Sequence, residues 1–309
     1  MFRINYYSTL LFVLINLSHH KIISAQENNS SPFIEILGTI QDGGAPHLGC
    51  VKSCCLALTQ KEKNERSITS LALHHPSDQT VFLFEATPDI QSQWEQLGKI
   101  PEGIFITHAH IGHYSGLLQL GREVLGAKNI PVYVMPKLQS FLEKNGPWSQ
   151  LVELKNISIR PIKENLSILI AENLSITPFT VPHRDEFSET VGYHIQGPKK
   201  AALFIPDIDK WVLWDNDLLN VLQSVDFAFI DGTFFDSEEI SNRSLKEIPH
   251  PFVVETMSLL KDATPQIKNK IYFIHMNHSN PLLNPESFAT KQVLEAGFQI
   301  SRKGQKFSL

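Results

Sequence analysis

Thr107-His108-Ala109-His110-Ile111-Gly112-His113 places three histidines within six residues of the chain. The stretch follows the apolar run Gly103-Ile104-Phe105-Ile106, which is typical of a buried β-strand. The neutral imidazole of histidine is a common metal ligand near neutral pH. Side chains at positions i and i+2 of an extended backbone point the same way, so we expect His108 and His110 to bind one ion together and His113 to reach a neighbouring ion.

Five apolar, strand-like segments end in a residue that can bind a metal. These residues are His108, His183, Asp207, Asp231 and His275. Loops at the carboxyl ends of strands converge on one rim in α/β architectures, so we expect the five side chains to meet. A single histidine after a strand is more often a loop residue with a hydrogen-bond partner. Five such ends, together with the triple-histidine stretch, indicate a metal site.

The overall composition is that of one soluble globular domain of mixed strands and helices. The chain has 309 residues, of which 42% are hydrophobic and 19% charged, enough for a sizeable core. The formal net charge of -5 gives no electrostatic indication of a nucleic-acid partner. Alternating apolar residues over 157–170 predict a hairpin of exposed strands.

The N-terminus is typical of an export signal. Arg3 precedes a short apolar core at residues 9–17, and Ile23-Ser24-Ala25 offers small residues for cleavage. The sequence therefore predicts a signal peptide over residues 1–25, a mature domain over residues 26–309, and a periplasmic or secreted location. The apolar run is too short to span a bilayer, so we expect no stable membrane insertion. The alternative is a disordered or weakly membrane-associated leader.

A second cluster, His47-Leu48-Gly49-Cys50-Val51-Lys52-Ser53-Cys54-Cys55, holds all three cysteines of the chain. Thiolates and an imidazole at such short spacing can hold a structural Zn²⁺. One disulfide and one spare thiol is the alternative in an exported protein. A disulfide would run from Cys50, because bridging the adjacent Cys54 and Cys55 strains the backbone.

Three further residues are candidates for the substrate pocket. Asp42 lies in the glycine-rich loop before the cysteine cluster, although a turn-capping aspartate would look the same. Asp231 can line the pocket or accept hydrogen bonds from its own Gly-Thr turn. His250 can be a pocket residue or an exposed loop histidine.

These stretches resemble the metallo-β-lactamase fold superfamily over nearly all of the chain after residue 25. That family carries a His-x-His-x-Asp-His motif after a strand, followed by a later histidine, a later aspartate and a final histidine. The matching positions are His108, His110, His113, His183, Asp207 and His275. The resemblance implies an α/β fold, the αββα sandwich, in which helices flank two mixed β-sheets.

Within the superfamily, the chain is similar to the pyrroloquinoline quinone biosynthesis protein B branch. Residues 84–89, 229–233 and 274–281 carry this likeness, and so does the glycine-rich loop with its cysteines. In that branch and in related phosphodiesterases the loop holds a structural zinc. The resemblance therefore favours zinc over a disulfide at His47, Cys50, Cys54 and Cys55, without deciding which of them bind.

One position departs from the family motif, because Gly112 stands where the family has the aspartate that ligates the second metal. We therefore expect the second site to rely on His113, Asp207, and His275 or the extra imidazole of His278. Loss of one carboxylate would make the site more positive and would favour an anionic small-molecule substrate.

The resemblance implies a zinc-dependent hydrolase. An ion held by His108, His110 and His183 would lower the pKa of a bound water from about 15.7 to about 7, producing the hydroxide that attacks an ester, lactone, amide or phosphodiester bond. Asp207 would bridge two ions or orient the nucleophile, and Asp207 and His275 are the expected catalytic residues.

Two other functions fit the same residues. A histidine and aspartate site with open positions can also hold iron and activate O₂, and the quinone-cofactor likeness makes an oxidative enzyme conceivable. A metal-stabilised binding protein without catalysis is the third reading. The sequence leaves the option of a homo-oligomer open.

Overall fold

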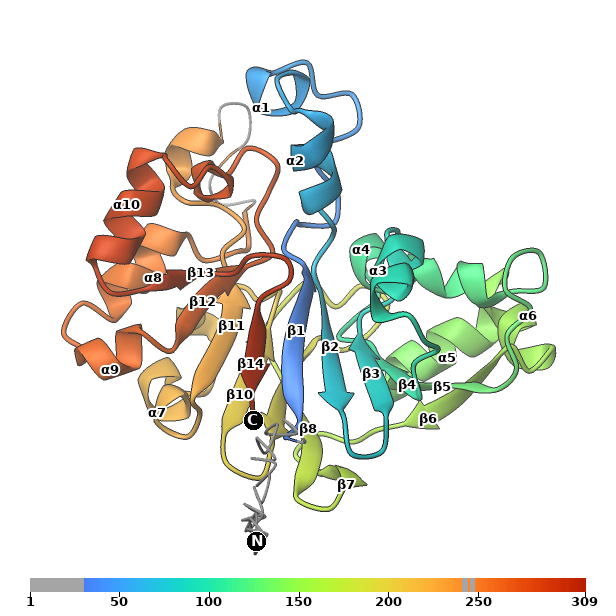
Figure 1. Ribbon diagram of the computed structural model, residues 1–309. Helices are drawn as coiled ribbons and strands as arrows, with labels where there is room; N and C mark the ends of the chain where they lie inside the picture. The colour runs from blue at the N-terminus through green and yellow to red at the C-terminus, as the bar shows by residue number, and fades with distance from the viewer. Residues whose placement is uncertain (1–30, 241–243, 245–247) are drawn as a thin grey trace, which may run out of the picture.

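The computed structural model describes residues 31–240, 244 and 248–309, so the export signal predicted for residues 1–25 lies outside the described part. Two seven-stranded β-sheets pack face to face, and helices cover the outer face of each sheet (Figure 1). This arrangement confirms the predicted αββα sandwich. Within the described ranges, no helix is both long enough and apolar enough to cross a membrane.

The first sheet joins the first described strand to the last strand of the chain. In sheet order its strands are β14 (Lys306–Ser308), β1 (Phe33–Gly38), β2 (Ser70–His75), β3 (Thr80–Phe84), β4 (Gly103–Phe105), β5 (Ile130–Val134) and β6 (Ile157–Pro161). Strands β3 to β6 are parallel to one another. Glu85 after β3 and the histidine stretch after β4 therefore leave the sheet at the same edge.

The second sheet is also mixed. In sheet order its strands are β13 (Gln299–Ile300), β12 (Ile271–Ile274), β11 (Phe227–Asp231), β10 (Ala201–Ile205), β9 (Val191–Gln196), β8 (Leu174–Thr180) and β7 (Ile168–Ala171). Strands β10 to β13 are parallel, so their carboxyl ends share one edge. Asp231 is the last residue of β11, and Asp207 and His275 come just after β10 and β12.

The hairpin predicted over residues 157–170 is wrong. Strand β6 pairs with β5 in the first sheet, whereas β7 pairs with β8 in the second. Both are edge strands, and each is only partly buried. An edge strand with one solvent-exposed face shows the same alternation of apolar and polar residues whichever strand it pairs with. The pattern therefore predicts the two strands but not their pairing.

The helices form two outer layers. The first sheet is covered by α3 (Ile90–Leu97), α4 (Ile111–Tyr114), the 3₁₀ helix η1 (Ser115–Leu120), α5 (Pro136–Lys144) and α6 (Trp148–Glu153). The second sheet is covered by η2 (Trp211–Leu213), α7 (Leu218–Gln223), α8 (Val253–Leu259), α9 (Pro265–Lys268), η5 (Pro281–Leu283) and α10 (Phe288–Glu295). Helices α1 (Ser53–Leu56) and α2 (Gln60–Glu65) project beyond the sheets, as Figure 1 shows. The short η3 (Ser237–Glu239) lies in the loop after β11.

An aromatic cluster fills the space between the sheets. The Phe105 ring stacks on Tyr133 at 4.3 Å and on Phe84 at 5.3 Å between centroids, and meets the edge of Tyr193 from the second sheet at 5.7 Å. The Tyr193 hydroxyl donates a hydrogen bond to the Ile106 carbonyl at 2.6 Å. These contacts fix the strand that leads into the histidine stretch.

The Phe105→Ala variant is expected to lower the free energy of unfolding by about 3–5 kcal/mol, because it leaves a cavity in a fully buried site. Urea titration at a fixed metal concentration measures the change. Phe288→Ala is the matched control, since the Phe288 side chain is 81% exposed and its removal should change stability little. Equal effects of the two substitutions would contradict this account of the core.

The segment after β1 connects the two sheets above their edges. Ile40 forms isolated bridges to both Ile68 and Met276. The Gln41 amide donates to the Met276 carbonyl at 2.9 Å, and the Met276 amide donates to the Thr39 carbonyl at 2.7 Å. The glycine-rich loop that begins at residue 42 is thereby held beside His275.

Candidate metal centre

Three overlapping groups of metal-capable side chains meet where the carboxyl ends of parallel strands from both sheets come together. They are His108, His110, His183 and Asp207; Asp42, His113, Asp207 and His275; and Asp207, Asp231, His250 and His275. In each group one ligand atom per residue lies within 4.8 Å of the others. The structure thus brings together the five predicted strand ends, and Asp207 belongs to all three groups.

The first group is built around Asp207. Its two carboxylate oxygens lie 3.4 Å from His108 Nε2 and 3.2 Å from His183 Nε2. His110 Nδ1 lies 2.8 Å from His108 Nε2. His108, His183 and Asp207 are buried, whereas the His110 side chain is 13% exposed, so this group opens toward solvent through His110.

The second nitrogen of each ring in this group is held by a polar neighbour. His108 Nδ1 lies 2.9 Å from Thr107 Oγ1, His183 Nδ1 lies 2.9 Å from Asp209 Oδ1, and His110 Nε2 lies 3.1 Å from Glu186 Oε2. Such contacts fix the orientation of a ligating imidazole. Sequence reasoning missed all three partners, although Thr107 and Asp209 lie beside predicted strand ends.

The second group contains Asp42, which sequence analysis placed in the substrate pocket. Asp42 Oδ1 lies 3.0 Å from His113 Nε2 and 3.1 Å from His275 Nε2. Asp207 Oδ2 lies 3.8 Å from the same His113 nitrogen. The other ring nitrogen of His113, Nδ1, lies 3.3 Å from Glu85 Oε1. Asp42 therefore sits among the candidate ligands.

The third group joins His250 to two carboxylates. His250 Nδ1 lies 2.8 Å from Asp231 Oδ2 and 3.1 Å from Asp207 Oδ1. Asp231 also accepts hydrogen bonds from the amides of Thr233 at 2.8 Å and Ile208 at 3.2 Å. His250 is buried rather than an exposed loop histidine, and its position depends on the fixed carboxylate of Asp231.

Two residues of the centre adopt left-handed backbone angles. Glu85 has a φ of 75° and His275 a φ of 64°. Residues other than glycine rarely occupy this region, and those that do are concentrated at functional sites.

The buried polar atoms of the centre fit a bound cation. His113 Nε2, His183 Nε2 and Asp207 Oδ1 are buried, and none has a hydrogen-bond partner among the described residues. A buried donor or acceptor without a partner costs about 1–3 kcal/mol. Divalent ions in the first and second groups would satisfy all three atoms, and imidazole nitrogens with carboxylate oxygens suit zinc as well as iron.

Without a cation, protons balance the carboxylates. Burial lowers the pKa of His183, but Asp207 outweighs it and raises that pKa to about 9. Burial likewise opposes the charged form of His113, yet Asp42 and Glu85 hold its pKa well above the usual value. Burial, reinforced by the charge on His113, keeps the pKa of His108 well below the usual value.

Adding Zn²⁺ to chelator-stripped protein at pH 7 is expected to release protons. His183, with a pKa of about 9, is protonated at that pH and must lose its proton before Nε2 can bind a cation. Zinc affinity should therefore fall as the pH falls, by about tenfold per pH unit for each proton displaced. A pH indicator in weak buffer measures the release. The His183→Gln variant should release fewer protons, and an affinity independent of pH between 6 and 8 would contradict the prediction.

The cysteine cluster forms a separate candidate site. Cys50, Cys54 and Cys55 are free thiols, and they group with His278 rather than with His47. The ring of His47 stacks on His278 at 4.4 Å, and the His47 amide donates to Cys55 Sγ at 3.3 Å. Burial raises the pKa of the Cys54 thiol to about 11 in the absence of a cation.

Of the two histidines expected as alternatives for the second catalytic group, His275 lies in that group and His278 lies with the thiols. The two histidines of the segment after β12 serve different clusters, since His275 faces Asp42 while His278 faces the thiols. The prediction for the thiol site did not decide which of its four residues bind, and His47 lies outside the group: its Nδ1 is 3.0 Å from the Leu48 carbonyl oxygen, and its ring stacks on His278.

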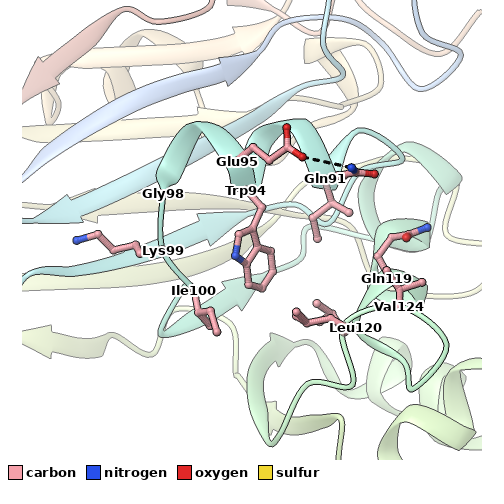
Figure 2. Close-up of a pocket in the computed structure, with 11 residues that line it drawn as sticks. Gln91, Trp94, Glu95, Gly98, Lys99, Ile100, Gln119, Leu120 and Val124 are labelled. Atoms are coloured by element: carbon pink, nitrogen blue, oxygen red, sulfur yellow. Dashed lines mark hydrogen bonds between the residues drawn. The ribbon is translucent and has the colours of Figure 1, made fainter.

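An apolar cavity of about 400 Å³ lies away from these clusters, between α3 and the end of η1. Figure 2 shows the Trp94 ring in this cavity, between Ile100 and Leu120. Its lining contains no member of the metal-capable groups. The cavity therefore belongs to the outer helix layer.

Known proteins share the fold described above. A protein B of coenzyme PQQ synthesis from Nitrosococcus oceani is 23% identical over 89% of this chain and 99% of its own length. The structure of Zn²⁺-bound PqqB from Methylobacterium extorquens has a TM-score of 0.74 at 22% identity, covering 90% of this chain and 100% of that one. A diphosphatase of the PhnP family has a TM-score of 0.63 at 20% identity, covering 90% and 97%.

A family model provides the assignment. The model described as the beta-lactamase superfamily domain matches residues 80–276. The match spans nearly the whole centre, from β3 to His275, whereas Asp42 and the three cysteines precede it. The chain belongs to the beta-lactamase superfamily, with the metallo-β-lactamase fold, and resembles the PqqB branch within it.

Proposed function

We propose that the chain is a metal-dependent hydrolase of a small-molecule ester, lactone or phosphodiester. The observation that carries the proposal is the position of Asp207, whose carboxylate is shared by the histidine-rich first and second groups. His108, His110, His183 and Asp207 would hold one divalent ion. When bound, such an ion lowers the pKa of a water ligand and withdraws charge from the bond that breaks.

A hollow beside His110 supports a substrate that carries negative charge. Its volume is about 500 Å³, and Lys137 and Lys144 place two ammonium groups on its wall. The lining also contains two carboxylates: Glu186 contacts His110, and Asp185 accepts a hydrogen bond from Thr190. The rings of Phe141 and Phe187, 5.3 Å apart, offer an apolar surface next to the charges.

The expectation of an anionic substrate was first based on the loss of a carboxylate at Gly112, and the hollow now provides a different basis for it. The absence of a side chain at Gly112 does not leave the centre short of a carboxylate, because Asp42 lies against that position. The lysines of the hollow, and not a missing aspartate, are what favours an anion.

His250 is placed to move a proton. Burial opposes its charged form, but Asp231 and Asp207 hold its pKa well above the usual value. Its ring centroid lies 5.7 Å from that of His183 and 6.1 Å from that of His275, between the first and second groups. A protonated imidazole there can give a proton to the leaving group, while Asp231 keeps the ring in place.

The relatives support both this function and a second candidate. One structural neighbour is named a diphosphatase, and this fits a hydrolase that acts on a phosphoryl group. Curated relatives are named for coenzyme PQQ synthesis, and this favours an iron-dependent oxidative enzyme of quinone cofactor metabolism as the alternative.

One experiment separates the two candidates. Protein stripped of metal is reloaded with Zn²⁺, Mn²⁺ or Fe²⁺ and assayed against aryl phosphodiesters, esters and lactones, with O₂ consumption recorded in parallel. Hydrolysis with Zn²⁺ or Mn²⁺ that disappears in His108→Ala supports the hydrolase. O₂ consumption with Fe²⁺ and no hydrolysis with any ion would overturn it in favour of the oxidative enzyme.

A further inference from the structure

The backbone around Gly112 has no room for a side chain. A Cβ atom at this position would lie 2.5 Å from Asp42 Oδ1, 2.6 Å from Asp42 Cγ and 2.7 Å from Asp42 Cα. Separations below about 3.0 Å require one of the two groups to move. Since one of the atoms met is the Asp42 Cα, the whole loop and not only a flexible carboxylate occupies this space.

The carboxylate that fills the space faces the second group. Asp42 Oδ1 is 3.0 Å from His113 Nε2, and its side chain is only 14% exposed. Among the described residues His113 Nε2 has no hydrogen-bond partner, whereas the same Asp42 oxygen pairs with His275 Nε2 at 3.1 Å. One carboxylate oxygen that faces two imidazole nitrogens at these distances is placed to share a cation with both of them.

The approach of Asp42 is fixed by backbone hydrogen bonds on its N-terminal side. Thr39 and Gln41 pair with Met276, the residue after His275. On its C-terminal side, Gly44 has a φ of 71° and accordingly turns the loop away. The position of Asp42 relative to His275 is therefore set by strand-like pairing, which is more rigid than an unpaired loop.

We propose that Asp42 is a ligand of a second metal ion, held by Asp42, His113, Asp207 and His275, and that it replaces the carboxylate absent from position 112. The proposal rests on the proposed function insofar as both need a metal in the centre. It adds that two ions bind, and that one of their ligands comes from a segment remote from the histidine stretch. The glycine at 112 is then a requirement of this arrangement and not a lost ligand.

The test counts metal ions per chain by inductively coupled plasma mass spectrometry and measures zinc affinity by chelator competition. Asp42→Ala is expected to bind one ion fewer than the parent. Asp42→Asn keeps the shape but not the charge, and should weaken the affinity for one ion by at least about 100-fold. Asp78→Asn is the matched control, since Asp78 is an exposed carboxylate that also contacts a histidine, and it should retain every ion.

Gly112→Ala provides a second route to the same loss. Its methyl group would displace Asp42 without removing a ligand, so it should also cost one ion and leave the first group loaded. Circular dichroism and thermal unfolding establish that each variant is folded.

Several outcomes would overturn the proposal. Asp42→Ala or Asp42→Asn with the ion count and affinities of the parent would show that Asp42 binds no metal. Loss of two centre ions in Asp42→Ala would show that it does not serve the second ion alone. A folded parent that binds no ion in the histidine and aspartate groups would overturn the proposed function as well, which distinguishes the two failures.

Discussion

Asp207→Asn is expected to lower hydrolysis by about 1000-fold or more and to weaken both centre ions. The Asp207 carboxylate belongs to every metal-capable group of the centre, so its neutralisation affects both ions at once. Loss of about 4 kcal/mol of transition-state stabilisation corresponds to this factor, and metal ions supply several kcal/mol. Initial rates with saturating metal, together with ion counts, measure the effect.

The control for this change is Asp215→Asn, which makes the same substitution at an exposed position after η2. It should leave rate and ion content unchanged. Asp207→Asn with two ions of parental affinity would contradict a shared carboxylate, even if the rate fell.

Cys55→Ser is expected to remove one ion and to destabilise the fold. Cys55 is the buried member of the thiol group with Cys50, Cys54 and His278. An ion that binds only the folded chain stabilises it by about 4 kcal/mol when its free concentration is 1,000 times the dissociation constant. Thermal unfolding with and without Zn²⁺ should therefore show a large zinc-dependent shift in the parent and a smaller one in Cys55→Ser.

The same variant should also weaken the second ion of the centre. The loop from Asp42 to Cys50 and the segment from His275 to His278 each contribute to both clusters. Releasing the thiol cluster frees one end of each segment. His47→Ala is the control, because His47 covers His278 by stacking and lies outside the group. Loss of the thiol-site ion in His47→Ala would contradict this division of roles.

The first metal group was accessible from the sequence because each of its residues follows a recognisable strand. His108, His183 and Asp207 end or closely follow apolar runs, and carboxyl ends of neighbouring strands meet at one edge. Local pattern and architecture together were sufficient to predict which of these side chains gather.

Asp42 and His278 needed information that no local pattern holds. Asp42 is 70 residues before Gly112 in the chain, and only the pairing of Thr39 and Gln41 with Met276 brings it to the centre. His275 and His278 are three residues apart, and the turn between them decides which cluster each ring faces. The fold of these loops, not the residue types, assigns their roles.

The same limit explains the misplaced hairpin. The alternation of apolar and polar residues in β6 and β7 indicates that each strand has one solvent-exposed face. Which sheet each strand joins depends on packing between layers, since the chain crosses from one sheet to the other between Pro161 and Ile168.

The division of the centre between the two sheets has a consequence for how the protein matures. The first sheet and its loops carry Asp42, His108, His110 and His113, whereas the second carries His183, Asp207 and His275. Neither half alone contains all the ligands of the first or the second group, whereas the four residues of the third group all belong to the second half. Tight metal capture by the first and second groups must then follow the docking of the halves, so an incompletely folded chain would lack the ions on which the proposed activity depends.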